Sequence, residues 1–242
     1  MASELSVLLV TAASIGFFHT VLGPDHYLPF IMMASARKWS KFKTLMITLL
    51  CGLGHIGSSI LLGGVGVALG IAVRKLEIVE SHRGDLAAWA LIAFGLVYFV
   101  WGVRRAYKNR RHVHRHYHEN GQLPAHADRH YQDQAAGIQA HGHANKGKAN
   151  ITPWALFVIF VLGPCEPLIP ILMYPAAQSS MSGLVLVTAV FGTVTIATMA
   201  GIVMASVWGI SFVRLGRLER YTHAVAGATI CLCGLAIRFL GL

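Results

Sequence analysis

Long apolar stretches separated by short polar segments make up most of this chain. Six stretches are long enough to cross a bilayer, which needs about 20 apolar residues, and they run near 5–33, 44–73, 86–106, 152–178, 183–212 and 222–242. This pattern predicts an all-α, polytopic membrane protein with six transmembrane helices. A polar segment divides them, so we expect a first three-helix repeat at 1–106, a linker at 107–150 and a second three-helix repeat at 151–242.

The two halves share a short identical motif. Val-Leu-Gly-Pro at 21–24 recurs at 161–164, an offset of 140 residues, and the same offset pairs Gly52 with Gly192. Because each half has an odd number of spans, the second copy enters the membrane upside down relative to the first. We therefore expect a 3+3 inverted repeat. In transporters of this design the binding site lies near the membrane midplane, where interrupted helices of the two copies meet.

Composition and charge agree with a membrane protein. Only 12% of the residues are charged, against roughly 25% in soluble domains. Of the 20 Lys and Arg residues, 16 lie on one side of the predicted spans, and that side faces the cytoplasm. We therefore expect a multi-pass protein of the cytoplasmic (inner) membrane, with the loop at 107–150 in the cytoplasm and both termini and the loop at 74–85 outside it. This topology explains the net charge of +10, so the lipid bilayer is an expected partner and nucleic acid is not. The sequence does not predict an oligomeric state.

Ionisable residues follow both Gly-Pro pairs. The first motif is Gly-Pro-Asp-His at 23–26 and the second is Gly-Pro-Cys-Glu at 163–166. A proline removes a backbone donor and clashes with the preceding turn, so both helices should break there. Broken backbone at membrane depth is tolerated against protein or a water-filled cavity, and an ionisable residue there indicates function. The alternative is that these are interfacial residues at helix ends.

Two further histidines belong to the candidate site. His19 precedes His26 by seven residues, or about two helical turns, and so lies on the same helix face. His55 lies in a glycine-rich part of the second span, where a hydrogen-bonded core histidine is the alternative interpretation. Imidazole together with carboxylate suits nickel, cobalt, zinc or iron better than magnesium or calcium. The predicted metal ligands are His19, Asp25, His26, His55, Cys165 and Glu166.

The linker at 107–150 has a composition that predicts disorder and metal binding. It has little apolar periodicity, which predicts disorder, and tracts rich in histidine can bind transition metals. The alternative is a merely solvated basic loop. Eight of the 13 histidines lie in this linker: His112, His114, His116, His118, His126, His130, His141 and His143.

At these residues the chain resembles the nickel/cobalt transporter and urease-accessory UreH-type membrane proteins, which belong with the sulfite-exporter (TauE-like) and DsbD-type transmembrane families. The resemblance covers the six-span plan, His19 with the motif at 23–26, and the motif at 163–166. Five residues separate His19 from Asp25, one more than in the nickel/cobalt permease signature, which favours the UreH-type branch. The resemblance implies a membrane transporter rather than an enzyme.

The predicted substrate is a divalent transition-metal ion, nickel or cobalt first, with zinc, iron or copper as other candidates. A histidine-rich loop between the halves resembles nickel/cobalt efflux proteins, so export is the favoured direction. Three alternatives stay open. They are an exporter of sulfite or another small anion, a thiol redox relay that uses Cys165, and a metal-delivery or assembly factor that binds metal without transporting it.

Overall fold

The computed structural model describes residues 2–71, 73–108, 151–165, 167–171, 180–212 and 216–240. Within these ranges all regular structure is helical, as the sequence predicts. The helices are α1 (Ala2–Leu22), η1 (Pro24–His26), α2 (Leu28–Arg37), α3 (Lys41–Ala68), α4 (Val73–Lys108), α5 (Ile151–Leu162), α7 (Met181–Ile210), η2 (Gly216–Tyr221) and α8 (Thr222–Leu240). Residues 168–171 are also helical. The histidine-rich part of the linker, from 109 to 150, and Glu166 lie outside the described residues.

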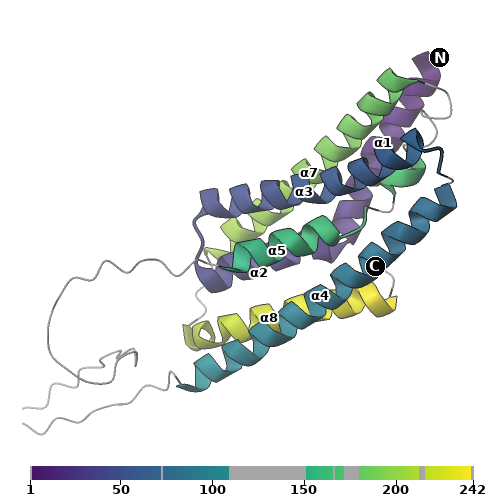
Figure 1. Ribbon diagram of the computed structural model, residues 1–242. Coiled ribbons are helices and arrows are strands. Elements are labelled where there is room, and N and C mark those ends of the chain that lie inside the picture. Colours follow the sequence, from purple (N-terminus) through teal and green to yellow (C-terminus); the bar gives the residue numbers. More distant parts are fainter. Residues whose placement is uncertain are drawn as a thin grey trace, which may run out of the picture.

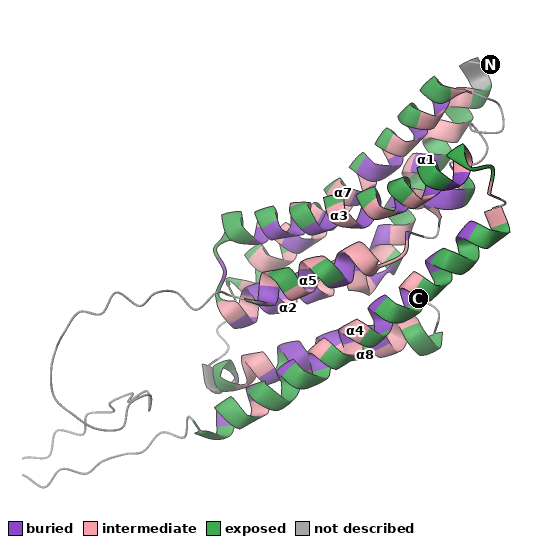
Figure 2. Ribbon diagram, viewed as in Figure 1, coloured by how far each residue is buried: buried purple, intermediate pink, exposed green. Residues whose placement is uncertain are grey.

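Five helices of the described chain are long and apolar enough to cross a membrane: α1, α3, α4, α7 and α8. Many large apolar side chains of these helices are exposed, as lipid-facing residues should be. Figure 2 shows exposed residues along the length of these helices. The remaining predicted span, 152–178, begins with the shorter apolar helix α5, and residues 172–179 lie outside the described part of the chain. The structure therefore agrees with a polytopic membrane protein and leaves the sixth span a prediction.

Two helix breaks fall where the prolines predict them. Helix α1 ends at Leu22 and α5 ends at Leu162, each directly before a Gly-Pro pair. After the first break, Pro24–His26 form a single 3-10 turn before α2 begins. Because proline has no backbone N–H to donate and its ring clashes with the preceding turn, neither helix continues through its motif.

The predicted loop at 74–85 is wrong. These residues form the first part of α4, which is 36 residues long and therefore about 54 Å at 1.5 Å per residue. Leu76 and Glu80, four residues apart on one face, are both buried. This buried face continues into the apolar part of the helix, so one long helix forms in place of a loop and a span.

Helices α4 and α8 pack against each other as a pair beside the other helices (Figure 1). Glycines allow the two backbones to come very close, as small residues do in membrane helix pairs. A Cβ built at Gly227 would contact the backbone of Phe99 and would lie 2.8 Å from the Gly95 carbonyl oxygen. The glycines of this interface that leave no room for a Cβ are Gly95, Gly102, Gly227 and Gly234.

The other helices bring the two breaks together. Helix α1 packs against α7, α3 packs against both α5 and α7, and α2 packs against α8 and α7. Helix α5 begins beside the end of α2, where Arg37 Nη2 donates to Thr152 Oγ1 at 2.9 Å. It then runs back along α2, where the rings of Phe160 and Phe30 lie 4.5 Å apart, and its C-terminal end points toward the region where α1 ends (Figure 1). Both helix ends face the same region of the interior.

Candidate metal site

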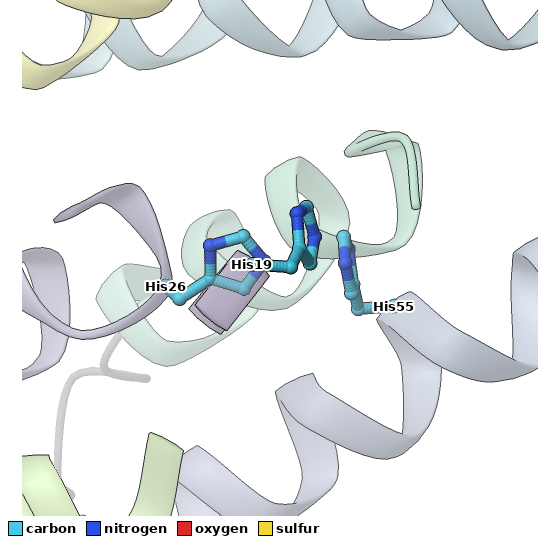
Figure 3. Close-up of side chains that lie close together, drawn as sticks. All are labelled: His19, His26 and His55. Atoms are coloured by element: carbon cyan, nitrogen blue, oxygen red, sulfur yellow. The ribbon is translucent and has the colours of Figure 1, made fainter. Parts of the chain in front are cut away.

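Three histidines from two helices and the first break converge in this interior region. His19 lies in the last turn of α1, His26 in η1 and His55 in the middle of α3. One ring nitrogen of each lies within 4.8 Å of one ring nitrogen of the others, and Figure 3 shows the three rings grouped together. The centroids of His19 and His26 are 4.7 Å apart and those of His26 and His55 are 5.2 Å apart. We call these three residues the histidine cluster.

Each member of the histidine cluster has a buried Nε2 atom with no hydrogen-bond partner among the described protein residues. An unsatisfied buried polar atom costs about 1–3 kcal/mol, and buried side-chain polar atoms are normally bonded. Three such atoms in one cluster are therefore unusual for a core that has only a structural role. A metal ion would use the three lone pairs at once.

Hydrogen bonds fix the protonation of two of the rings. His55 Nδ1 lies 3.2 Å from the Phe160 carbonyl oxygen, and His26 Nδ1 lies 3.1 Å from both the Gly23 carbonyl oxygen and Asp25 Oδ1. Carbonyl and ionised carboxylate oxygens only accept, so each Nδ1 must carry the hydrogen and donate it. In the neutral rings Nε2 then carries the lone pair, the form in which histidine binds a metal while its other nitrogen donates to a carbonyl or carboxylate.

The glycines of both breaks make room for these rings. A Cβ built at Gly23 would lie 2.6 Å from His26 Nδ1 and 2.9 Å from Asp25 Oδ1. A Cβ built at Gly163 would lie 3.2 Å from His55 Nδ1. The two Gly-Pro motifs therefore contact the histidine cluster from the two halves of the chain, one through His26 and the other through His55.

The spacing of the cluster suits a single small cation. Two nitrogens bound to one zinc ion lie at most roughly 4.2 Å apart, because each sits about 2.0–2.1 Å from the metal. A separation within 4.8 Å is close to that range and needs only small side-chain movements. Imidazole nitrogens are ligands for zinc, copper, iron and nickel, whereas magnesium and calcium prefer oxygen.

The structure places the other predicted ligands differently. The Asp25 carboxylate lies next to the cluster and accepts from His26 Nδ1, and its side chain is 30% exposed. Cys165 is fully buried in a separate apolar cluster with residues such as Ala12, Leu168 and Phe191. Glu166 lies outside the described residues. Among the predicted ligands that the structure describes, it therefore brings His19, His26 and His55 together, with Asp25 beside them.

One part of this region has only a weak signal in the sequence. Arg83 of α4 donates to the carbonyl oxygen of Val161, next to the second break, and to the Glu80 carboxylate. That signal is an acidic and a basic residue three positions apart, Glu80 and Arg83, in a segment whose charged residues predict a loop. Their burial could be recognised only once α4 was seen to begin at Val73.

Comparisons of the chain with protein-family models, with curated proteins and with solved structures find no match.

Proposed function

We propose that this chain is a transporter of a divalent transition-metal ion in the cytoplasmic membrane, with nickel or cobalt as the first candidates and export as the favoured direction. The observation that carries the proposal is the histidine cluster, whose buried Nε2 atoms have no partner among the described residues. The metal is the substrate. Zinc, iron and copper stay candidates because imidazole binds them as well.

The helix packing supports a 3+3 inverted repeat, the architecture proposed for the complete chain. Gly52 of α3 packs against Ile196 of α7, and Gly192 of α7 packs against Ile56 of α3. The offset of 140 residues that pairs Gly52 with Gly192 also pairs Ile56 with Ile196. This reciprocal contact is the kind that a two-fold axis produces. The α1–α7 and α5–α3 pairs are related in the same way, and the span predicted at 152–178 is the sixth of this proposed repeat.

Transport is tested in proteoliposomes that contain a metal-sensitive dye. The linker histidines would complicate any binding measurement, so the assay also uses a full-length protein in which the eight histidines between 112 and 143 are replaced by glutamine. We call this variant the Gln-linker protein. Both proteins should carry nickel or cobalt across the membrane, and the Gln-linker protein should lose activity only at low metal concentration, where capture by the linker matters.

The same assay separates the alternatives. A protein that binds metal but leaves the dye unchanged at every concentration would be a delivery or assembly factor. A protein that moves sulfite and no metal would be an anion exporter. A thiol redox relay would lose all activity in Cys165→Ser, whereas a metal path through histidine would keep most of it.

Replacing Asp25 with asparagine should weaken metal binding without abolishing it. The carboxylate accepts from His26 Nδ1 at 3.1 Å, so it orients the ring and makes Nε2 a better ligand. Loss of such an outer partner costs roughly 10- to 100-fold in metal affinity. The affinity is measured by chelator competition on the Gln-linker protein, and an unchanged value in Asp25→Asn would contradict this role.

The proposed orientation has the 107–150 segment in the cytoplasm and both termini outside it. The basis is the positive-inside rule applied to the 16 Lys and Arg residues on one side. Single cysteines introduced at 120 and at the N-terminus of a cysteine-free variant should respond oppositely to an impermeant thiol reagent on intact cells. We expect labelling at the N-terminus and protection at 120, and the reverse result would overturn this topology.

A further inference from the structure

The Arg83 side chain joins three helices at the second break. Its Nη1 donates to Glu80 Oε1 at 2.8 Å within α4. Its Nη2 lies 2.7 Å from Ser58 Oγ of α3 and 2.8 Å from the Val161 carbonyl oxygen of α5. The side chain is only 19% exposed and Glu80 is 1% exposed, so this is a largely buried ion pair whose donors reach beyond their own helix.

Arg83 supplies what the end of α5 lacks. The last carbonyl groups of a helix have no partner within it, and the proline at 164 ends the helix without a backbone N–H to offer. Arg83 Nη2 donates to the Val161 carbonyl oxygen and lies 3.4 Å from the Gly163 carbonyl oxygen. A positive charge at a helix C-terminus is also favourable for the helix dipole.

Two routes lead from Arg83 to His55, one through the α5 backbone and one through the Ser58 hydroxyl. In the first, Arg83 holds the α5 turn in which the Phe160 carbonyl oxygen accepts from His55 Nδ1 at 3.2 Å. In the second, Arg83 donates to Ser58 Oγ, and that hydroxyl donates to the His55 carbonyl oxygen at 2.8 Å. The first route ends on the ring of His55 and the second on its backbone carbonyl oxygen.

We propose that Arg83 is the positioning residue for His55, holding its ring with Nδ1 protonated and Nε2 turned toward the histidine cluster. This inference rests on the proposed function for its metal-binding consequence. It also explains why His26 and His55, both buried, are oriented by different residues. His26 has Asp25 next to it in the sequence, whereas His55 has no carboxylate partner among the described residues and depends on the α5 turn that Arg83 holds. Glu80 balances the Arg83 charge, which limits repulsion of a cation.

The first test needs no metal. Nitrogen NMR of the full-length Gln-linker protein, labelled on histidine, reports the tautomer of each of its five remaining histidines. We expect His55 to be protonated on Nδ1 alone, and Arg83→Gln to convert it to a mixture of tautomers while exposed His82 is unchanged. The matched control is Lys38→Gln, which removes an exposed ion pair to Glu219 of 2.7 Å and should leave His55 unaltered. An unchanged His55 tautomer in Arg83→Gln would overturn the inference.

The second test is a double-mutant cycle on zinc affinity, measured by chelator competition. Arg83→Gln should weaken binding roughly 10- to 100-fold, as loss of an outer partner does. In a His55→Ala background it should cost nothing further, because residues that act through one another are not additive. Additive losses would refute the positioning role.

These two tests separate this inference from the proposed function. A wild-type protein that binds no metal would contradict the proposed function, and the tautomer of His55 would still decide the role of Arg83. If Arg83→Gln does not fold, Ser58→Ala removes only the route to the His55 backbone. We then expect a smaller displacement of the His55 resonances, and no displacement would count against the inference.

Discussion

Replacing His26 or His55 with alanine is expected to weaken metal binding by the Gln-linker protein more than about 100-fold. Each change removes one of three ring nitrogens that lie within 4.8 Å of one another. The ion would then keep two imidazole ligands in place of three. Loss of an outer partner alone costs roughly 10- to 100-fold in affinity, so loss of a ligand should exceed about 100-fold. Isothermal calorimetry with nickel, cobalt and zinc measures the affinity, and the transport rate should fall in parallel.

The matched control is His82→Ala. His82 is an exposed histidine of α4 that is not part of the histidine cluster, so its loss should leave affinity and stoichiometry unchanged. The variants must insert into the membrane and elute as the parent does. Normal affinity in both His26→Ala and His55→Ala would show that the cluster is not the binding site.

Replacing Gly227 with leucine is expected to destabilise the protein by separating α4 from α8. A Cβ at this position would contact the Phe99 backbone and lie 2.8 Å from the Gly95 carbonyl oxygen, atoms that move only with the whole helix. Over-packing of this kind typically lowers the free energy of unfolding by about 1–3 kcal/mol. Because the new side chain would meet backbone atoms, we expect a loss at the upper end of that range, about 3 kcal/mol. The free energy of unfolding in detergent, from denaturant titration followed by fluorescence, measures the loss.

Gly201→Leu is the matched control for that change. Gly201 also lies within a long apolar helix, α7, but a Cβ there would meet nothing within 4 Å. An exposed substitution of this kind usually changes stability by no more than about 0.5 kcal/mol. If Gly227→Leu and Gly201→Leu have the same stability, the close packing of α4 on α8 does not contribute as described.

The positions of the two breaks could be predicted because their cause is local. A proline ends the preceding helix wherever the chain is placed, and α1 and α5 end at Leu22 and Leu162 as expected. The apolar spans likewise follow from composition and length. His26 could be placed next to a break, and His19 on the same face, from spacing along one helix alone.

The rest depended on contacts between distant segments. Nothing in the sequence near His55 indicates that its Nδ1 meets the carbonyl oxygen of Phe160, 105 residues away. The sequence also does not indicate that α4 begins at Val73, because a charged segment beside an apolar span is typical of a loop. Leu76 and Glu80 are buried by tertiary packing, and that packing extends the helix and brings Arg83 to the second break.

X-ray absorption at the zinc edge of the zinc-loaded Gln-linker protein reports directly which atoms bind the ion. We expect one ion per chain with about three imidazole nitrogens at roughly 2.0–2.1 Å, and two in His26→Ala loaded at a higher zinc concentration, because His19, His26 and His55 are the proposed ligands. A spectrum with oxygen ligands alone, or one that is identical in the parent and in His26→Ala, would contradict this ligand set.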